Sequence, residues 1–449
     1  MHDNDYILQF HIDLENIVET EVRGVAGQIK GAWLLGGCDV SKPVTNYLWY
    51  KGLALRDKYM ACGGRQDTFE ALRVSIESIA SGDYKISNVV KQNCKWNKIL
   101  SGEQGKIVFY ATSPRILEYM RPILCAMTED FVLLTHCNVN YKDALPECAT
   151  IVSFTLTKTE VFENQLLAGL FPKIYCYANT IRSYIDALKP SLIVCMDGCQ
   201  TEYQLAALFC GQKSIPSVCL QLGWPSMLHE GFHDMPYTYF LTWGKGFSEL
   251  WEMRNKSIGF IDTGYPYNVE VNGDHSAITF FLQAPIFLLT DAYLGRMYKL
   301  ITDTAMRYGG CMILVREHPD YQVDEEQKKI WKEQPNISIV SDLPLADVFA
   351  RTQIAVSCYS SSIMESVVHG CVPLVFCLAT GARYNPDIED EGIGFIADSE
   401  VAFFEKLESI KTSQCKTHAL HGRTYWFYKV GENAVKSAVE TISHLAGCK

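Results

Sequence analysis

The sequence lacks the features of several large protein classes. No stretch reaches the roughly 18 uninterrupted apolar residues that a bilayer-spanning helix needs. The first residues, MHDNDYILQFHID, carry three acids and no basic segment ahead of an apolar run, so we expect no secretory signal peptide. Low-complexity tracts and internal repeats are also missing. These absences favour a globular cytoplasmic protein, in which any association with the inner face of a membrane is peripheral.

Basic residues are too few for a typical nucleic-acid-binding surface. The 449 residues include 40 Lys and Arg against 51 Asp and Glu, a net charge of −11. Proteins that bind DNA or RNA usually present a strongly basic face, so we expect no nucleic-acid partner. A site for a small anionic ligand stays open, because a few local cations and helix N-termini can dominate the field in a cleft.

The 17 cysteines lack the spacing of a disulfide framework or a metal site. No CxxC pair occurs, and most cysteines stand inside apolar runs such as SLIVCMDG and PSVCLQLG. We interpret them as buried, reduced thiols, since a free cysteine behaves as a small hydrophobic residue. No DxD, HExxH or Cys/His cluster stands where a cleft is expected, so we predict no metal and no cofactor.

Apolar runs and helical patterns alternate from about residue 105 onward. Continuous apolar strands separated by helices are typical of parallel sheets covered on both faces. A polar stretch at 268–276 divides the runs into two series, so we expect two doubly wound α/β domains, at 105–270 and 271–449. The expected strands are 106–112, 131–135, 151–154, 192–196, 217–220, 239–243 and 259–263, then 286–289, 312–315, 337–340, 354–357 and 374–376.

The remaining residues, 1–104, show no such alternation. A helical pattern around 68–80 indicates a mostly helical extension. Pro172 must break or offset the second of the longer helices expected after residue 105. Those helices are 115–127, 161–188, 202–211 and 434–445.

Three consecutive serines, Ser360, Ser361 and Ser362, follow the expected strand 354–357. Ser362 and Glu365 have the spacing of a capping box at a helix that begins near Ser362. Two interpretations stay open. Ordinary capping needs only one serine, whereas a phosphate held at the positive end of the helix would use several amides and hydroxyls. Three serines in a row favour the phosphate site.

Arg316, His318 and Pro319 follow the expected strand 312–315. The carboxyl ends of parallel strands line the crevice where such folds bind ligands. Pro319 restricts the backbone of His318. An imidazole at this edge can donate a hydrogen bond to a phosphate oxygen, so we predict a ligand contact.

Asp197 and Gly198 follow the expected strand 192–196 in the first domain. A carboxylate at this edge can deprotonate a hydroxyl as a general base or attack an anomeric carbon as a nucleophile. Gly198 permits a tight turn. The alternative is that Asp197 only caps the helix expected at 202–211.

Weaker candidates stand in two other loops. Gln221, His229 and Glu230 belong to a loop, QLGWPSMLHE, punctuated by glycine and proline after an expected strand. Tyr384 follows the expected strand 374–376, where a loop can contact a base or a sugar. We place all four at the cleft, together with Gly198.

On these residues the sequence resembles bacterial GT-B glycosyltransferases of surface-polysaccharide assembly, over about 105–445 and most clearly over 310–376. His318-Pro319 is similar to the HP motif of enzymes that use CMP-activated sugars, including bacterial sialyltransferases and Kdo transferases. The three serines resemble the Ser/Thr phosphate motif of those enzymes. Met196-Asp197-Gly198 is similar to their acidic D/E-D/E-G motif, although Met196 replaces the first acid. The run TYFLTWG also looks like a wider group that includes CDP-glycerol transferases.

The resemblance implies a GT-B fold, with two Rossmann-like domains facing a cleft. It implies metal-independent transfer of Kdo or a related ulosonic acid from a CMP-linked donor to a growing glycan or lipid-linked glycan. His318 and the serines would stabilise the departing phosphate, with Arg316, Pro319 and Glu365 on the donor side. Asp197 would act from the other domain, as a base with inversion or as a nucleophile with retention.

Three alternatives stay open on the same fold. They are a UDP-sugar 2-epimerase, a CDP-glycerol or UDP-sugar transferase, and a non-catalytic nucleotide-binding protein. The long extension at 1–104 favours a transferase, because an epimerase needs no polymeric acceptor. The extension would then shape the acceptor site.

Overall fold

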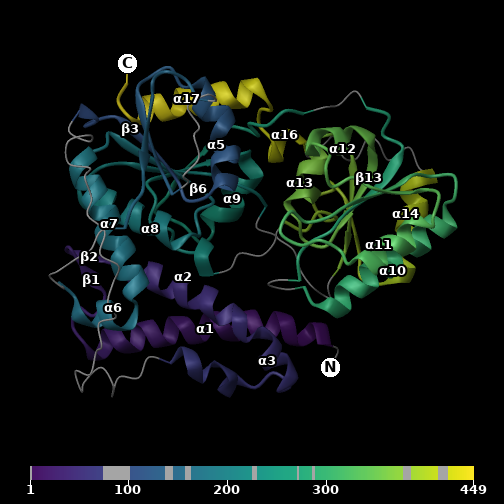
Figure 1. Ribbon diagram of the computed structural model, residues 1–449, viewed down its shortest axis with the longest axis horizontal. Helices are drawn as coiled ribbons and strands as arrows, with labels where there is room; N and C mark the ends of the chain where they lie inside the picture. Colours follow the sequence, from purple (N-terminus) through teal and green to yellow (C-terminus); the bar gives the residue numbers. More distant parts are fainter. Residues whose placement is uncertain are drawn as a thin grey trace. The chain divides into compact units, whose positions relative to one another are not determined.

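The computed structural model describes residues 3–73, 102–136, 145–156, 163–224, 230–269, 273–285, 289–377, 386–412 and 423–448. The chain forms two compact units (Figure 1). The N-terminal unit comprises Gln9–Leu222, Leu228–Pro266 and Glu432–Lys449. The C-terminal unit comprises Met1–Leu8, Gly223–Met227 and Tyr267–Gly431.

The N-terminal unit is built on a parallel sheet with the strand order β5-β4-β3-β6-β7-β8-β9. Every residue of β3, β4, β6 and β7 is buried, because helices cover both faces of the sheet. The strands are β3 (Ile107–Ala111), β4 (Phe131–Thr135), β5 (Ala149–Ser153), β6 (Leu192–Met196), β7 (Ser217–Leu220), β8 (Tyr239–Thr242) and β9 (Gly259–Asp262).

Two of the expected helices begin one residue earlier than predicted, at Pro114 and Thr201, and the helix expected at 161–188 begins at Gln165. Ser113 caps the first of them, since its Oγ accepts a hydrogen bond from Ile116 N at 3.3 Å. Pro172 occupies the first turn of a new helix, which confirms the predicted break. The helices are α5 (Pro114–Ala126), α6 (Gln165–Leu170), α7 (Pro172–Leu188), α8 (Thr201–Gln212), η6 (Glu230–Phe232) and α9 (Lys245–Glu252).

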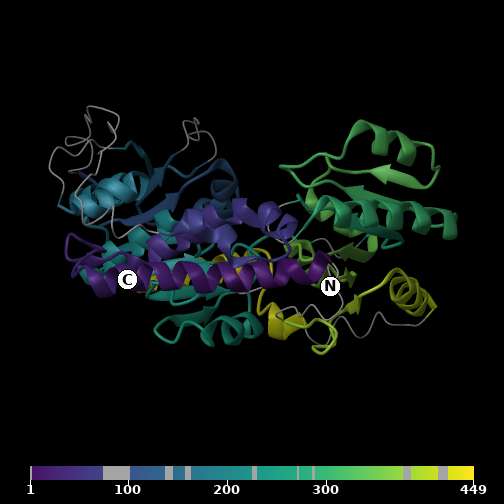
Figure 2. The same cartoon turned by 90° about the horizontal axis from the view of Figure 1, so that it is seen from below.

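The described part of the extension is mostly helical, as predicted, and includes one short hairpin. Thr68 belongs to a 3₁₀ helix that ends at Leu72, and the rest of the expected helix at 68–80, beyond Arg73, lies outside the described residues. The elements are α1 (Asp3–Gln28), β1 (Leu34–Leu35), β2 (Cys38–Asp39), α2 (Ser41–Gly52), η1 (Leu53–Leu55), α3 (Arg56–Ala61) and η2 (Gln66–Leu72). Figure 2 shows α1 as the long purple helix, and α2 packs on α8.

The C-terminal unit has a second parallel sheet, with the strand order β12-β11-β10-β13-β14-β15. Its strands are β10 (Ala277–Phe281), β11 (Ile313–Arg316), β12 (Ile337–Ile339), β13 (Thr352–Ser357), β14 (Val372–Phe376) and β15 (Phe395–Ala397). Its helices are α10 (Asp291–Arg307), α11 (Glu325–Lys332), α12 (Leu345–Arg351), α13 (Ser361–Val368), α14 (Glu400–Thr412) and α16 (Arg423–Trp426).

Two features of the chain differ from the sequence-based expectations. The first strand of the second sheet is β10, not the apolar run at 286–289; Leu289 is in no strand, and 286–288 are outside the described residues. All five residues of β10 are buried because the strand pairs with both β11 and β13. The last helix, α17 (Glu432–Leu445), belongs to the N-terminal unit, where it packs on α5 (Figure 1).

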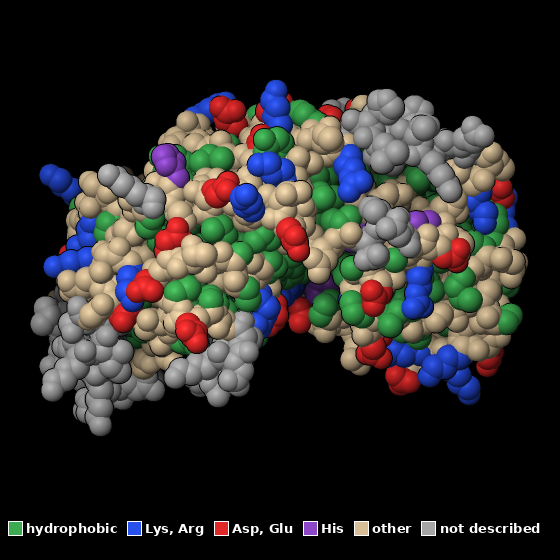
Figure 3. Space-filling view, turned by 90° about the horizontal axis from the view of Figure 1, so that it is seen from above, with side chains coloured by type: hydrophobic (Ala, Val, Ile, Leu, Met, Phe, Trp, Pro, Cys, Tyr) green, Lys and Arg blue, Asp and Glu red, His purple; other side chains and the backbone are tan. Residues whose placement is uncertain are grey.

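Within the described residues, no helix is long and apolar enough to cross a membrane. Basic and acidic side chains are interspersed on the face of the molecule in Figure 3.

Candidate functional site

The strand order of the N-terminal sheet reverses between β3 and β6. The chain runs outward from β3 through β4 to β5, and then returns to place β6 on the other side of β3. Ligands of such sheets bind at the carboxyl ends of the two strands that flank the reversal. Thr112 follows β3 and Asp197 follows β6 at this edge.

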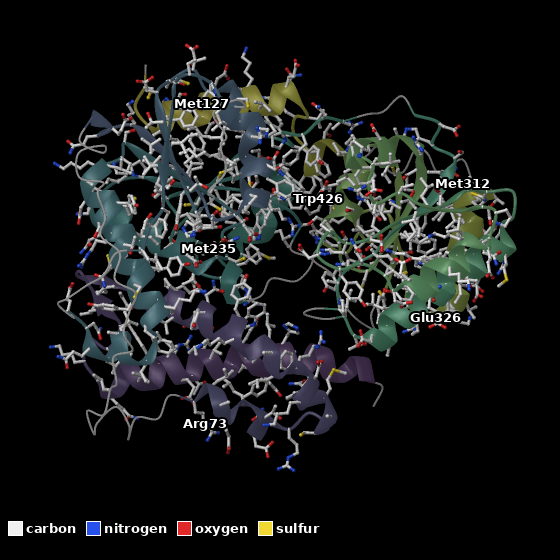
Figure 4. The ribbon with its side chains drawn as sticks, in the orientation of Figure 1. Arg73, Met127, Met235, Met312, Glu326 and Trp426 are labelled. Atoms are coloured by element: carbon white, nitrogen blue, oxygen red, sulfur yellow. The ribbon has the colours of Figure 1, made fainter. Side chains whose placement is uncertain are left out.

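Asp197 and Gly198 form a turn of two successive residues with positive φ, +77° and +88°. Asp197 N donates to Leu220 O at 3.0 Å, which fixes the start of the turn beside β7. A Cβ on Gly198 would lie 2.9 Å from Met235 Sδ, the residue labelled in Figure 4, and 3.2 Å from Phe240 Cε2. Gly198 is therefore required, and Asp197 carries backbone strain of the kind that gathers at functional sites.

The turn excludes the alternative that Asp197 caps the next helix. The N-cap residue of α8 is Gln200, three positions further on, and no side chain makes a cap hydrogen bond there. The Asp197 carboxylate is held instead by Cys199, whose Sγ donates to Oδ2 at 3.3 Å.

The environment of Asp197 changes its acidity. Burial raises the pKa of the carboxyl above its ordinary value, while hydrogen bonds from Cys199 and Gln200 and the charge of Arg115 act in the opposite direction. A raised pKa brings a carboxylic acid closer to neutral pH, where a general base or acid works best.

Thr112 links the end of β3 to the start of α8, the helix that follows β6 and Asp197. Its hydroxyl donates to Gln200 Oε1 at 2.8 Å, and its backbone N donates to Tyr203 OH at 3.0 Å. Tyr203 is fully buried on α8. The edge that carries Asp197 is thus braced by side chains of β3 and α8, which sequence reasoning did not single out.

The loop after β7 begins with a side chain that stabilises the fold. Gln221 is buried, and its Oε1 accepts a hydrogen bond from Trp243 N at 2.8 Å, which ties the end of β7 to the end of β8. A contact of Gln221 with an acceptor stays a prediction. Glu230 begins η6, whereas His229 and Tyr384 are outside the described residues.

The C-terminal sheet reverses its strand order between β10 and β13. Gln283, just beyond β10, accepts hydrogen bonds at Oε1 from Tyr359 N at 3.0 Å and from Ser357 Oγ at 3.3 Å. The Gln283 side chain therefore fixes the loop from β13 to α13. Sequence reasoning missed Gln283 because it missed β10; the buried run ITFFL was the signal.

The three serines begin α13, one residue earlier than predicted. Ser360 is the N-cap residue, and its Oγ accepts a hydrogen bond from Ser362 N at 3.3 Å. The predicted capping box of Ser362 and Glu365 is wrong, because with this cap its acidic position falls on Ile363. Glu365 is buried in the middle of the helix.

The other two serines are the first two residues of α13. Ser361 Oγ accepts a hydrogen bond from Trp224 N at 3.0 Å. A Cβ on the preceding Gly223 would clash with this hydroxyl, so a side chain there would displace Ser361 Oγ. A phosphate at this helix end stays a prediction, and it would use backbone amides and the Ser362 hydroxyl.

His318 lies in the turn after β11, as predicted. Its Nδ1 accepts a hydrogen bond from Asp320 N at 3.1 Å, so in the neutral ring the hydrogen is on Nε2. The side chain is 21% exposed. Pro319 occupies the same turn, which Tyr321 N closes by donating to His318 O at 3.1 Å.

Arg316 is the last residue of β11, and its side chain makes hydrogen bonds that stabilise the fold. Its Nη1 donates to Leu343 O at 2.6 Å and to Val340 O at 3.3 Å, which joins β11 to the loop before α12. A contact of Arg316 with a donor phosphate stays a prediction and would use the other guanidinium nitrogens.

Glu317, which sequence reasoning passed over, anchors the loop that carries His318. Its carboxylate accepts hydrogen bonds from Val323 N at 2.8 Å and Ser341 Oγ at 3.0 Å, and pairs with Lys328 Nζ at 3.1 Å. Burial acts to raise the pKa of Glu317, but these three donors outweigh it and hold the pKa below its usual value. Glu317 is therefore ionised and fixed.

Comparison with solved structures agrees with this architecture. The UDP-GlcNAc 2-epimerase of Neisseria meningitidis, bound to UDP-GlcNAc, is 12% identical with a TM-score of 0.51 over 76% of this chain and 100% of that one. The Methanocaldococcus jannaschii UDP-GlcNAc 2-epimerase, in complex with UDP-GlcNAc and UDP, gives 12% and 0.51 over 76% and 99%. The glycotransferase of kitacinnamycin gives 10% and 0.51 over 76% and 99%.

The chain has the two-domain GT-B α/β fold. At these identities the likeness shows the fold alone. No protein-family model matches the chain, and no curated protein has a significant sequence match to it. In the described parts of both units, no three His, Cys, Asp or Glu side chains are grouped as metal ligands.

Proposed function

We propose that the chain is a glycosyltransferase that moves a sugar from a nucleotide-activated donor to a glycan or lipid-linked glycan. The donor is CMP-linked and carries Kdo or a related ulosonic acid. The observation that carries the proposal is Asp197, a strained and partly buried carboxyl at the strand-order reversal of the N-terminal sheet. The HP resemblance at His318-Pro319 supports the CMP nucleotide.

His318 and the serines at 360–362 bind the donor in the C-terminal unit. The Nε2 hydrogen of His318 donates to a phosphate oxygen, and the backbone amides at the start of α13 stabilise the charge that develops on the departing CMP. Glu317 supports this role because it fixes the loop of His318.

Asp197 supplies the chemistry. As a general base it takes the proton of the acceptor hydroxyl, and the product has inverted configuration. As a nucleophile it forms a glycosyl-enzyme that the acceptor then attacks, with net retention. Intact mass of protein incubated with donor alone decides between them, since only the nucleophile gives a sugar adduct that Asp197→Asn abolishes.

A nucleotide panel tests the donor. A ligand at 100 times its Kd stabilises the native state by about 2.7 kcal/mol, which raises the unfolding temperature measurably. We expect stabilisation by CMP and CDP, its loss in His318→Ala, and its retention in Asp197→Asn, whose substitution is in the other unit. A response to UDP alone would overturn the CMP assignment.

The second candidate is a UDP-sugar 2-epimerase, which the fold shared with the Neisseria and Methanocaldococcus enzymes favours. An epimerase changes the configuration of its own sugar nucleotide and needs no acceptor. NMR of UDP-GlcNAc incubated with the protein distinguishes the two functions: a second UDP-sugar formed without acceptor supports the epimerase and contradicts the transferase.

A further inference from the structure

Helix α2 of the N-terminal extension reaches the loop that carries Asp197. The Tyr50 hydroxyl lies 3.1 Å from Cys199 Sγ, and Cys199 Sγ lies 3.3 Å from Asp197 Oδ2. A thiol has one hydrogen, and here it points to the carboxylate. The Tyr50 hydroxyl must then donate to the sulfur, so the chain of hydrogen bonds runs from α2 to Asp197.

The same helix also holds the backbone of this loop. Asn46, one turn before Tyr50 on α2, is fully buried, and its Nδ2 donates to Cys199 O. Residues four apart share one face of a helix, so both side chains contact the loop together. Helix α2 also packs on α8, the helix that follows this loop.

The groups that interact with Asp197 are one cation and several neutral side chains, and the hydrogen-bonded Cys199 is one of the neutral ones. Arg115 contributes a positive charge, while Cys199, Tyr203 and Cys219 interact with Asp197 as neutral groups. Burial raises the pKa of all three well above the ordinary values, so they stay protonated at pH 7. Of the three, Cys199 donates directly to Asp197.

Tyr50 likewise stays a donor. Burial, with the nearby Cys199, Asp197 and Glu202, raises the pKa of its phenol well above the usual range. Both members of the chain are therefore protonated through the whole range in which a carboxyl titrates. A hydrogen bond to the ionised form of an acid favours that form.

We propose that Tyr50 and Cys199 are positioning residues that orient Asp197 and keep it ionised against the effect of burial. This inference rests on the proposed function only for the catalytic role of Asp197. The contacts of Tyr50 and Cys199 do not depend on that function. It gives α2 a task in the active site: the extension supports the reacting carboxylate.

The test compares four substitutions with the wild-type protein. Cys199→Ala removes the donor to Asp197, Cys199→Ser keeps one, and Tyr50→Phe removes the first member of the chain. Cys210→Ala is the matched control, because Cys210 is a buried thiol of α8 in the same unit. Thermal unfolding confirms that each variant is folded.

The first readout needs no substrate. The infrared carboxyl band that Asp197→Asn removes gives the pH at which Asp197 is half protonated. We expect this pH to rise by about one unit in Cys199→Ala, less in Tyr50→Phe, and little in Cys199→Ser or the control, since the lost hydrogen bond favoured the charged form. The same midpoint in Cys199→Ala as in wild type would overturn the proposal.

The second readout is the pH dependence of kcat/KM for sugar transfer. The acidic limb should shift upward in Cys199→Ala by as much as the infrared midpoint, and Cys199→Ser should restore it. If the infrared midpoint shifts in Cys199→Ala while Asp197→Asn remains active, the proposed function is wrong, but the effect of Cys199 on the protonation of Asp197 is confirmed. If Asp197→Asn is inactive and Cys199→Ala titrates as wild type, the positioning role fails instead.

Discussion

Gly198→Ala tests whether the turn after β6 is as constrained as its geometry indicates. The residue has φ of +88°, and an added Cβ would meet Met235 Sδ at 2.9 Å, Phe240 Cε2 at 3.2 Å and Cys219 Sγ at 3.4 Å. A left-handed alanine costs about 1–2 kcal/mol, and overpacking of a closed core costs about 1–3 kcal/mol. Met235 is flexible and can absorb part of the second cost.

We therefore expect Gly198→Ala to lower the unfolding free energy of the N-terminal unit by about 2–4 kcal/mol. The two units need not unfold together, so the measurement is hydrogen exchange of the β6 and β7 amides, which reports on this sheet. Gly211→Ala is the control: Gly211 lies in α8, nothing lies within 4 Å of an added Cβ, and alanine favours a helix. Unchanged protection of the β6 amides in Gly198→Ala would mean that the turn tolerates a side chain at this position.

Three further predictions concern titration and buried charge. Because burial raises the pKa of Asp197, the native state loses stability as the pH rises above the ordinary value of 3.8; Asp197→Asn should remove this loss in urea titrations at pH 4 and 7. Burial lowers the pKa of His136, the residue after β4, to about 4, so stability should fall as the pH drops from 6.5 to 4, by about 1–2 kcal/mol because the ring is partly exposed, and His136→Gln should abolish that fall. Glu317→Gln leaves Lys328 without its closest carboxylate and should lower the unfolding free energy in urea by about 1–3 kcal/mol. It should also reduce the rise in unfolding temperature that CMP causes. An unchanged rise would mean that the loop of His318 does not take part in donor binding.

Local pattern was enough to place the inner strands. The runs that became β4, β6 and β7 were predicted to the residue, because an inner parallel strand is apolar on both faces and ends where polar turn residues begin. Pro172 was read correctly for a similar reason, since it cannot continue a helix that precedes it. These signals need no knowledge of the neighbours in space.

Competing local signals produced the errors. The buried run of β10 and the apolar run at 286–289 look alike in sequence, and only pairing with β11 and β13 identifies the strand. The start of α13 was placed at Ser362 because Glu365 stood at capping-box spacing, whereas Ser360 is the cap. Likewise α17 follows the second series in the chain but packs on α5 of the first unit.

Local sequence patterns predict the α/β class, most of the strands, and two places where polar residues follow strands, at Asp197 and at His318. They can do so because periodicity and turn residues are local properties of the chain. How those residues are held depends on the packed chain: the positive φ of Asp197, its thiol donor Cys199, the hydroxyl of Tyr50 that contacts this thiol, and Glu317, which anchors the loop of His318. Tyr50 and Cys199 are 149 positions apart in the chain. Contacts of that kind depend on packing, which no single segment encodes.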